Sequence, residues 1–227
     1  MRKLILAIAA LALLAGCSKK DVTYTGKESG FIQNGVFLSD SNVKMTIMGN
    51  ERNYDIDSPR RVLIAYETCP GMDDDNIGID LQGLMVAIIR EPFHVDTMDD
   101  NPSETPIQVS DAWFSGGYLN ILASARVVVY DKHLCSANYT ADENGITIRL
   151  THSSAETVSA GSGQMANVFL SLPMEDPVLS WEHCCQAVGK KAVYPVPVLF
   201  QWTDNVVEAG PVTLYERKGT YTPPASN

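Results

Sequence analysis

The hydrophobic pattern of the chain begins with an uncharged apolar run from Leu4 to Leu14, which follows the basic residues Arg2 and Lys3. Small residues end the segment. This order is typical of a secretory signal peptide. The run is too short to span a bilayer, which takes about 20 apolar residues. We therefore expect the chain to be exported and residues 1–16 to be removed.

The rest of the chain has the pattern of short β-strands. Residues 18–30 are polar and predict a tether. Runs of strand-forming residues then alternate with turn residues. The predicted strands cover residues 35–39, 43–48, 61–68, 77–90, 117–130, 146–152, 168–172 and 196–202. The apolar stretch 84–89 predicts deep burial. Pro195 and Pro197 favour an edge position for the last strand, because proline cannot donate a hydrogen bond to a sheet ladder.

One short stretch, residues 181–188, has the periodicity of a helix. Its apolar side chains recur at positions i, i+3, i+4 and i+7 and are Trp181, Cys184, Cys185 and Val188. Ser180 is a suitable N-cap and Gly189 a suitable end, which places one helix near 180–189. Because a helix of two turns depends on packing for its stability, we expect this stripe to face the core.

A polar loop at residues 91–106 divides the predicted strands into two groups. It contains three prolines among acidic and polar residues, so we expect a domain boundary near residue 105. The resulting architecture is all-β, with one domain at residues 31–105, a second at 106–222 and a tail at 223–227.

Composition indicates an acidic globular protein. A hydrophobic content of 45% with scattered charge argues against disorder. Removal of residues 1–16 leaves 211 residues, enough for two small domains or one large one. The removed residues 1–16 include two basic residues and no acidic ones, so the net charge changes from −10 for the full chain to −12 for the remainder. Such a surface repels phosphate backbones, which argues against nucleic acid as a partner.

The end of the signal peptide contains a specific motif. Leu14-Ala15-Gly16-Cys17 resembles the lipobox of bacterial lipoproteins, in which the cysteine thiol receives a diacylglycerol and the chain is cut just before it. The resemblance implies that Cys17 is the lipid attachment residue, that residues 17–30 form a lipidated tether and that the membrane is a partner. Each buried methylene of the lipid adds about 0.8 kcal/mol to anchoring.

The residues directly after Cys17 indicate where in the cell envelope the protein is expected to lie. Ser18-Lys19-Lys20-Asp21 is basic before it is acidic, whereas surface-exported lipoproteins often have an acidic run there. Lysines beside the acyl chains also suit an anionic membrane surface. We therefore expect a lipid-anchored protein of the cell envelope, on the outer membrane and facing the periplasm. The alternative is a tether that carries no address.

Residues 73–80 invite comparison with a calcium loop, which needs oxygen ligands at alternate positions. Ile77 occupies the alternate position after Asp73 and Asp75, where a strand is expected to begin. We interpret the segment as a solvated hairpin tip, with a weak cation site as the alternative.

Four cysteines and one histidine are of the residue types that bind zinc: Cys69, Cys135, His183, Cys184 and Cys185. Structural zinc sites usually have a short spacer between paired cysteines, and here two are adjacent. Their helical spacing favours core packing, so we expect no metal or other cofactor. Adjacent cysteines cannot easily bond to each other. A long-range disulfide from Cys69 or Cys135 and four free thiols both remain open.

No set of residues has the pattern of a catalytic site. His94 lies near Asp96, Asp99 and Asp100, but in a loop without a nucleophile nearby. The serines 153, 154 and 162 lack a nucleophile elbow. The glycine-rich residues 160–164 lack the lysine of a phosphate-binding loop. We therefore expect no catalytic residues.

One motif resembles a known family. Residues 111–120, Asp-Ala-Trp-Phe-Ser-Gly-Gly-Tyr-Leu-Asn, resemble the D-x-W-x-S-G-G-Y-L-N segment of NigD-like lipoproteins of Gram-negative gut bacteria. Residues 61–66 and 148–152 extend the resemblance. It implies an N-terminal OB-like β-barrel and a C-terminal immunoglobulin-like β-sandwich. It also points to bacteriocin immunity, while no catalytic residue carries over.

Three functions are consistent with the sequence. The first is a non-enzymatic envelope lipoprotein that binds a protein or glycan partner through a loop or sheet surface. The second is a structural or assembly subunit of the envelope. The third is a hydrolase with an unrecognised site, for which a pocket with a shifted-pKa group would be the sign.

Overall fold

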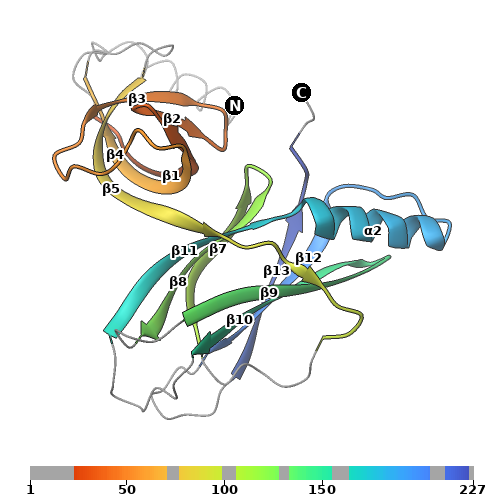
Figure 1. Ribbon diagram of the computed structural model, residues 1–227. Coiled ribbons are helices and arrows are strands. Elements are labelled where there is room, and N and C mark those ends of the chain that lie inside the picture. Colours follow the sequence, from red (N-terminus) through yellow and green to blue (C-terminus); the bar gives the residue numbers. More distant parts are fainter. Residues whose placement is uncertain are drawn as a thin grey trace, which may run out of the picture. The chain divides into compact units, whose positions relative to one another are not determined.

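The computed structural model describes residues 23–70, 77–98, 106–127, 133–154, 164–204 and 213–224 (Figure 1). Strands dominate these ranges, and the all-β fold class is confirmed. The chain divides into two compact units, residues 1–84 and 85–227. The division falls inside one long strand, whereas the boundary expected near residue 105 lies outside the described residues.

The first unit is an OB-like barrel, coloured orange to yellow in Figure 1. Its strands are β1 (Thr25–Gln33), β2 (Val36–Ser39), β3 (Lys44–Gly49), β4 (Arg60–Thr68) and the first half of β5 (Ile77–Ile89). Strand β1 pairs with β2 and β4, and β3 pairs with β2 and, in parallel, with β5. Strand β5 also neighbours β4, so the sheet closes on itself around Ile32, Phe37, Ile64 and Ile79.

The first strand of this barrel was missed by the sequence analysis, whose first predicted strand, residues 35–39, corresponds to β2. Residues 25–30, expected within the tether, form part of β1, and Ser29 and Gly30 are buried. A Cβ atom on Gly30 would lie 2.2 Å from the carbonyl oxygen of Leu38. The glycine therefore permits close approach of β2. The sequence analysis missed this strand because its polar and small residues lack the apolar pattern from which strands are predicted. The small residues act instead by leaving room for the neighbouring strand.

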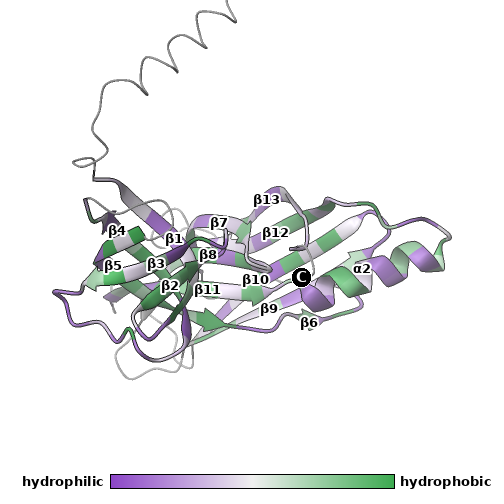
Figure 2. Cartoon of the chain, turned by 90° about the horizontal axis from the view of Figure 1, so that it is seen from above, coloured by the Kyte–Doolittle hydropathy of each residue, from purple (hydrophilic) through white to green (hydrophobic). Residues whose placement is uncertain are grey.

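The second unit is a β-sandwich, coloured yellow-green to blue in Figure 1. One sheet has the order β5-β11-β8-β7, with β11 (Gln164–Pro173), β8 (Tyr118–Val127) and β7 (Gln108–Ser115). The other has the order β13-β12-β10-β9-β6, with β13 (Thr213–Tyr221), β12 (Val196–Asp204), β10 (Gly145–Ser154), β9 (His133–Asp142) and β6 (Phe93–His94). Hydropathy alternates along strands of this unit (Figure 2). The inward positions of β10 are Ile146, Ile148 and Leu150.

Two expectations about these strands were wrong. The apolar stretch 84–89 is only partly buried, and Val86 is 46% exposed. This stretch of β5 passes from one core to the other. Leu84 packs against the barrel core, and Ile88 packs against the sandwich core. Strand β12 is internal rather than at an edge. Pro197 is tolerated there because it is the second residue of the strand, before the β10 ladder begins at Val198.

The predicted helix is present but longer. Helix α2 spans Glu175–Ala187, so Ser180 lies within it and Met174 is the N-cap. Proline is compatible with the first helical turn, where Pro177 lies, because backbone N–H groups there have no intrahelical partner. Trp181 and Cys185 face the core as expected, while Val188 is 54% exposed just after the helix end. Within the described ranges, no helix has the length and apolar character of a membrane span.

Candidate functional site

A groove of about 700 Å³ lies on the outer face of the sheet formed by β9, β10, β12 and β13. The segment 96–98, just after β6, forms one wall. The inward residues of these strands fill the sandwich core, so the residues between them necessarily point outward into the groove. The described residues that line the groove belong to the second unit.

Strand register arranges the outward side chains of this sheet face, most of which line the groove, in three rows. Asp142, Gly145 and Pro197 lie in the row at the β9–β10 turn. The next row holds Thr140, Thr147, Leu199 and Lys218, and the last holds Asn138, Arg149, Gln201 and Glu216. The outer rows are four residues apart along the strand, which corresponds to about 13 Å.

The last row contains a hydrogen-bonded chain across three strands. The guanidinium of Arg149 donates from Nε and Nη2 to Gln201 Oε1, at 3.1 and 2.9 Å. Gln201 Nε2 in turn donates to Glu216 Oε1 at 2.7 Å. Gln201 is only 7% exposed, so its amide is held in one orientation. The chain therefore fixes the guanidinium on the groove floor.

The turn end of the groove is acidic. The carboxylate of Asp142 accepts hydrogen bonds from the backbone N–H groups of Asn144 and Gly145, at 2.7 and 3.1 Å. Gly145 has a φ of 158° and sits so close to Pro197 that a Cβ atom would lie 2.6 Å from its carbonyl oxygen. Asp96 is exposed on the neighbouring wall. The turn thus places two carboxylates at this end.

The groove is lined by polar and aliphatic side chains. Its described lining combines charged, hydroxyl and amide groups with the aliphatic side chains of Leu199, Pro197 and Met98, and it includes no cysteine, histidine or serine. Among the described residues there is also no group of three or more histidine, cysteine or acidic side chains that could hold a metal.

The structure disperses the residues that the sequence singled out. The ring of His94 packs edge-on against Tyr139, with centroids 5.2 Å apart. Asp96 lines the groove, whereas Asp99 and Asp100 lie outside the described residues. Ser153 is exposed in β10. Ser162, the side chain of Ser154 and residues 160–163 lie outside the described set, as do Cys17 and residues 73–76.

The four cysteines after Cys17 are free thiols, two of them adjacent in α2 and the other two in different parts of the fold. Cys69 donates to Asp80 Oδ1 at 3.6 Å, and burial followed by the charge of Asp80 raises the pKa of its thiol. Burial likewise raises the pKa of the Cys135 thiol. Cys184 donates to the carbonyl oxygen of Ala141 at 3.4 Å. A raised pKa keeps the thiols of Cys69 and Cys135 protonated at neutral pH, which is the opposite of what a nucleophile needs.

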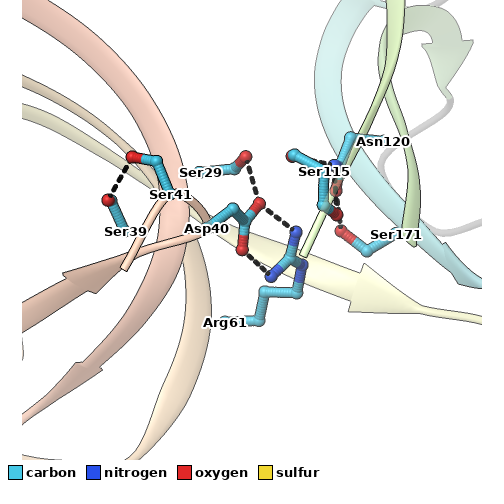
Figure 3. A network of polar contacts seen from close by, with 8 residues as sticks. All are labelled: Ser29, Ser39, Asp40, Ser41, Arg61, Ser115, Asn120 and Ser171. Atoms are coloured by element: carbon cyan, nitrogen blue, oxygen red, sulfur yellow. Dashed lines mark hydrogen bonds and ion pairs between the residues drawn. The ribbon is translucent and has the colours of Figure 1, made fainter. Parts of the chain in front are cut away.

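The motif at residues 111–120 forms the β7–β8 hairpin. Gly116 and Gly117 have φ of 57° and 87°, the left-handed conformation required by a tight hairpin turn. Asn120, which is fully buried, donates from Nδ2 to Ser115 Oγ at 2.8 Å and accepts from Ser171 Oγ at 2.9 Å (Figure 3). Trp113 stacks on Phe169 with centroids 5.9 Å apart. The conspicuous residues of the motif therefore have structural contacts.

A buried ion pair in the barrel escaped the sequence analysis. Arg61 donates to both carboxylate oxygens of Asp40, at 2.8 and 2.7 Å, and Ser29 Oγ donates to the same carboxylate at 2.6 Å (Figure 3). The side chains of Arg61 and Asp40 are 0% and 7% exposed. A short-range sequence pattern cannot predict this pair, because 21 positions separate Asp40 from Arg61.

Comparison with solved structures finds proteins of similar fold. A protein of unknown function from Bacteroides vulgatus matches with a TM-score of 0.58 at 13% identity, covering 90% of this chain and 92% of that one. A NigD-like immunity protein from Bacteroides caccae gives 0.58 at 15%, covering 86% and 93%. A candidate lipoprotein from Bacteroides fragilis gives 0.56 at 10%, covering 86% and 97%. No family model and no curated protein matches the sequence significantly.

The fold is that of a NigD-like protein. The fold that the resemblance of residues 111–120 implied, a barrel followed by a sandwich, is therefore confirmed. None of these three comparison proteins carries the name of an enzyme.

Proposed function

We propose that this chain is a lipid-anchored protein of the bacterial cell envelope that binds a partner in the groove over β9, β10, β12 and β13, without catalysing a reaction. The observation that carries the proposal is the fixed guanidinium of Arg149 in an outward-facing groove of about 700 Å³. Binding sites typically combine a concave surface with a few polar groups held in place by the scaffold.

The energetic argument concerns pre-organisation. A free arginine side chain loses rotamer freedom when it binds, at a cost of roughly 0.5–1.5 kcal/mol. Here the hydrogen bonds to Gln201 already restrict the guanidinium before any partner arrives. The aliphatic surface of Leu199 and Pro197 lies between the charged ends and adds apolar contact area.

The comparison proteins support the envelope setting and one specific role. The names of two of them refer to a lipoprotein and to an immunity protein. We propose anchoring through Cys17, with the groove facing the periplasm from the outer membrane, and bacteriocin immunity as the specific role. Protease treatment of intact cells tests the orientation: cleavage of the tether without rupture of the outer membrane would contradict it.

A photo-cross-linking experiment tests the groove as the binding surface. A photoreactive amino acid replaces Leu199 on the groove floor, and in a matched control it replaces Leu38, which is 45% exposed on the barrel. We expect a saturable adduct in native envelopes from position 199 only. Excess unlabelled wild-type protein should suppress it, and excess Leu199→Arg protein should not. Equal labelling at both positions, or no adduct at 199, would overturn the proposal.

A further inference from the structure

The groove has charges of opposite sign at its two ends. Asp96 and Asp142 lie at the turn end. Arg149 lies in the row about 13 Å further along the strands. Lys218 is exposed in the middle row on β13, and it forms no ion pair with an acidic side chain among the described residues. Glu216 lies in the same row as Arg149 and carries a negative charge, so among the described residues Arg149 and Lys218 together leave this part of the groove with a net positive charge.

We infer that the occupant of the groove is an extended polypeptide segment with a basic residue at the turn end and an acidic residue about four positions away. The inference rests on the proposed function and specifies the chemistry of its partner. An extended chain advances about 3.3–3.6 Å per residue, so four residues span the distance between the two charged rows. Charge complementarity of this kind fixes the register of a bound segment.

The groove lining argues against a glycan as the occupant. Sugar rings commonly pack on aromatic side chains, since the face of an aromatic ring is both apolar and electron-rich. None of the described residues that line the groove is aromatic. The middle row instead offers Leu199 beside Thr140 and Thr147, which suits a small aliphatic or hydroxyl side chain between the charged positions.

Binding of synthetic peptides to the mature chain tests the inference. The first probe is a seven-residue peptide with one arginine and one glutamate four positions apart. The second has the same composition with these two residues adjacent. The third is trigalacturonate, an acidic sugar of similar length. At low ionic strength, calorimetry should detect binding of the first probe, about tenfold weaker binding of the second and none of the third.

Charge reversals in the protein locate the two ends. Lys218→Glu and Asp96→Lys should each weaken the first probe about tenfold, because like charges then meet across the interface. The Asp96→Lys protein should recover binding when glutamate replaces the arginine of the peptide. Lys44→Glu and Glu51→Lys, exposed on the barrel side of the chain, are controls of the same charge change and should have no effect.

The outcomes separate the inference from the proposed function. Equal binding of the two peptides, no binding of either, or binding of trigalacturonate alone would overturn the polypeptide inference. A cross-linked adduct at position 199 that resists proteases and contains sugar would do the same, yet it would leave the groove as the binding surface. Loss of the adduct itself would instead overturn the proposed function.

Discussion

Replacement of Asp40 by asparagine should strongly destabilise the barrel. The carboxylate accepts two hydrogen bonds from Arg61 and one from Ser29, and the Arg61 side chain is fully buried. Asparagine has nearly the same shape, but its amide group would turn a donor toward a guanidinium that has only donors. A buried charge would lose its counter-charge, which costs about 3–5 kcal/mol.

The sequence supplies a matched control in the adjacent arginine. Arg60 pairs with Asp55, and their side chains are 25% and 51% exposed. Exposed ion pairs contribute about 0.2–1 kcal/mol, so Asp55→Asn should have a small effect. The double variant Asp40→Leu, Arg61→Met should recover much of the lost stability, because an apolar pair removes the uncompensated charge.

Hydrogen exchange resolved by segment is the suitable assay. All three tryptophans lie in the second unit, at positions 113, 181 and 202, so their fluorescence does not report on the barrel. We expect the slowest amides of β1 and β4 to exchange two to three powers of ten faster in Asp40→Asn, at about 1.4 kcal/mol per tenfold. A change as small as that of Asp55→Asn would refute the reasoning.

Three further predictions address other parts of the chain. Cys17→Ala should move the protein from the membrane to the soluble fraction, and its retention after a high-salt wash would contradict lipid anchoring. Gly30→Ala should destabilise the barrel by about 1–3 kcal/mol in urea unfolding, because its Cβ would meet the backbone of Leu38. Gly83→Ala, whose Cβ would meet an ordinary contact at 3.5 Å, is the control and should be close to neutral. Burial and a hydrogen bond to Glu28 raise the pKa of Tyr66 to about 12. Below pH 10 the phenol is neutral in both states, and between pH 10 and 12 only the unfolded state loses the proton, so barrel stability should fall there. Tyr66→Phe should remove this decrease in pH-dependent unfolding, and an unchanged decrease would contradict the assignment.

The features that the sequence predicted well depend on local order along the chain. Alternating residues such as Ile146, Ile148 and Leu150 indicate a half-buried strand whatever it pairs with, and β10 is confirmed. The motif at residues 111–120 carries its own turn glycines, and the family fold that it implies is confirmed. The helix was found from the spacing of Trp181 and Cys185, but its start was missed because acidic residues and a proline obscure the first turn.

Other features depend on which strands become neighbours. Strand β12 was expected at an edge, and only the sheet order shows that it lies between β10 and β13. That order brings Arg149 against Gln201, which is 52 residues away, and Gln201 against Glu216. Asp40 and Arg61 meet in the same way across the barrel.

The sequence by itself therefore determined the all-β class and the family fold, because each is encoded in short-range spacing. The same kind of spacing predicts the export signal. The tertiary structure alone decided the groove and the buried ion pair. Strand pairing is fixed by burial summed over the whole sheet, and a side chain's partner across a sheet leaves no periodic trace in its own segment.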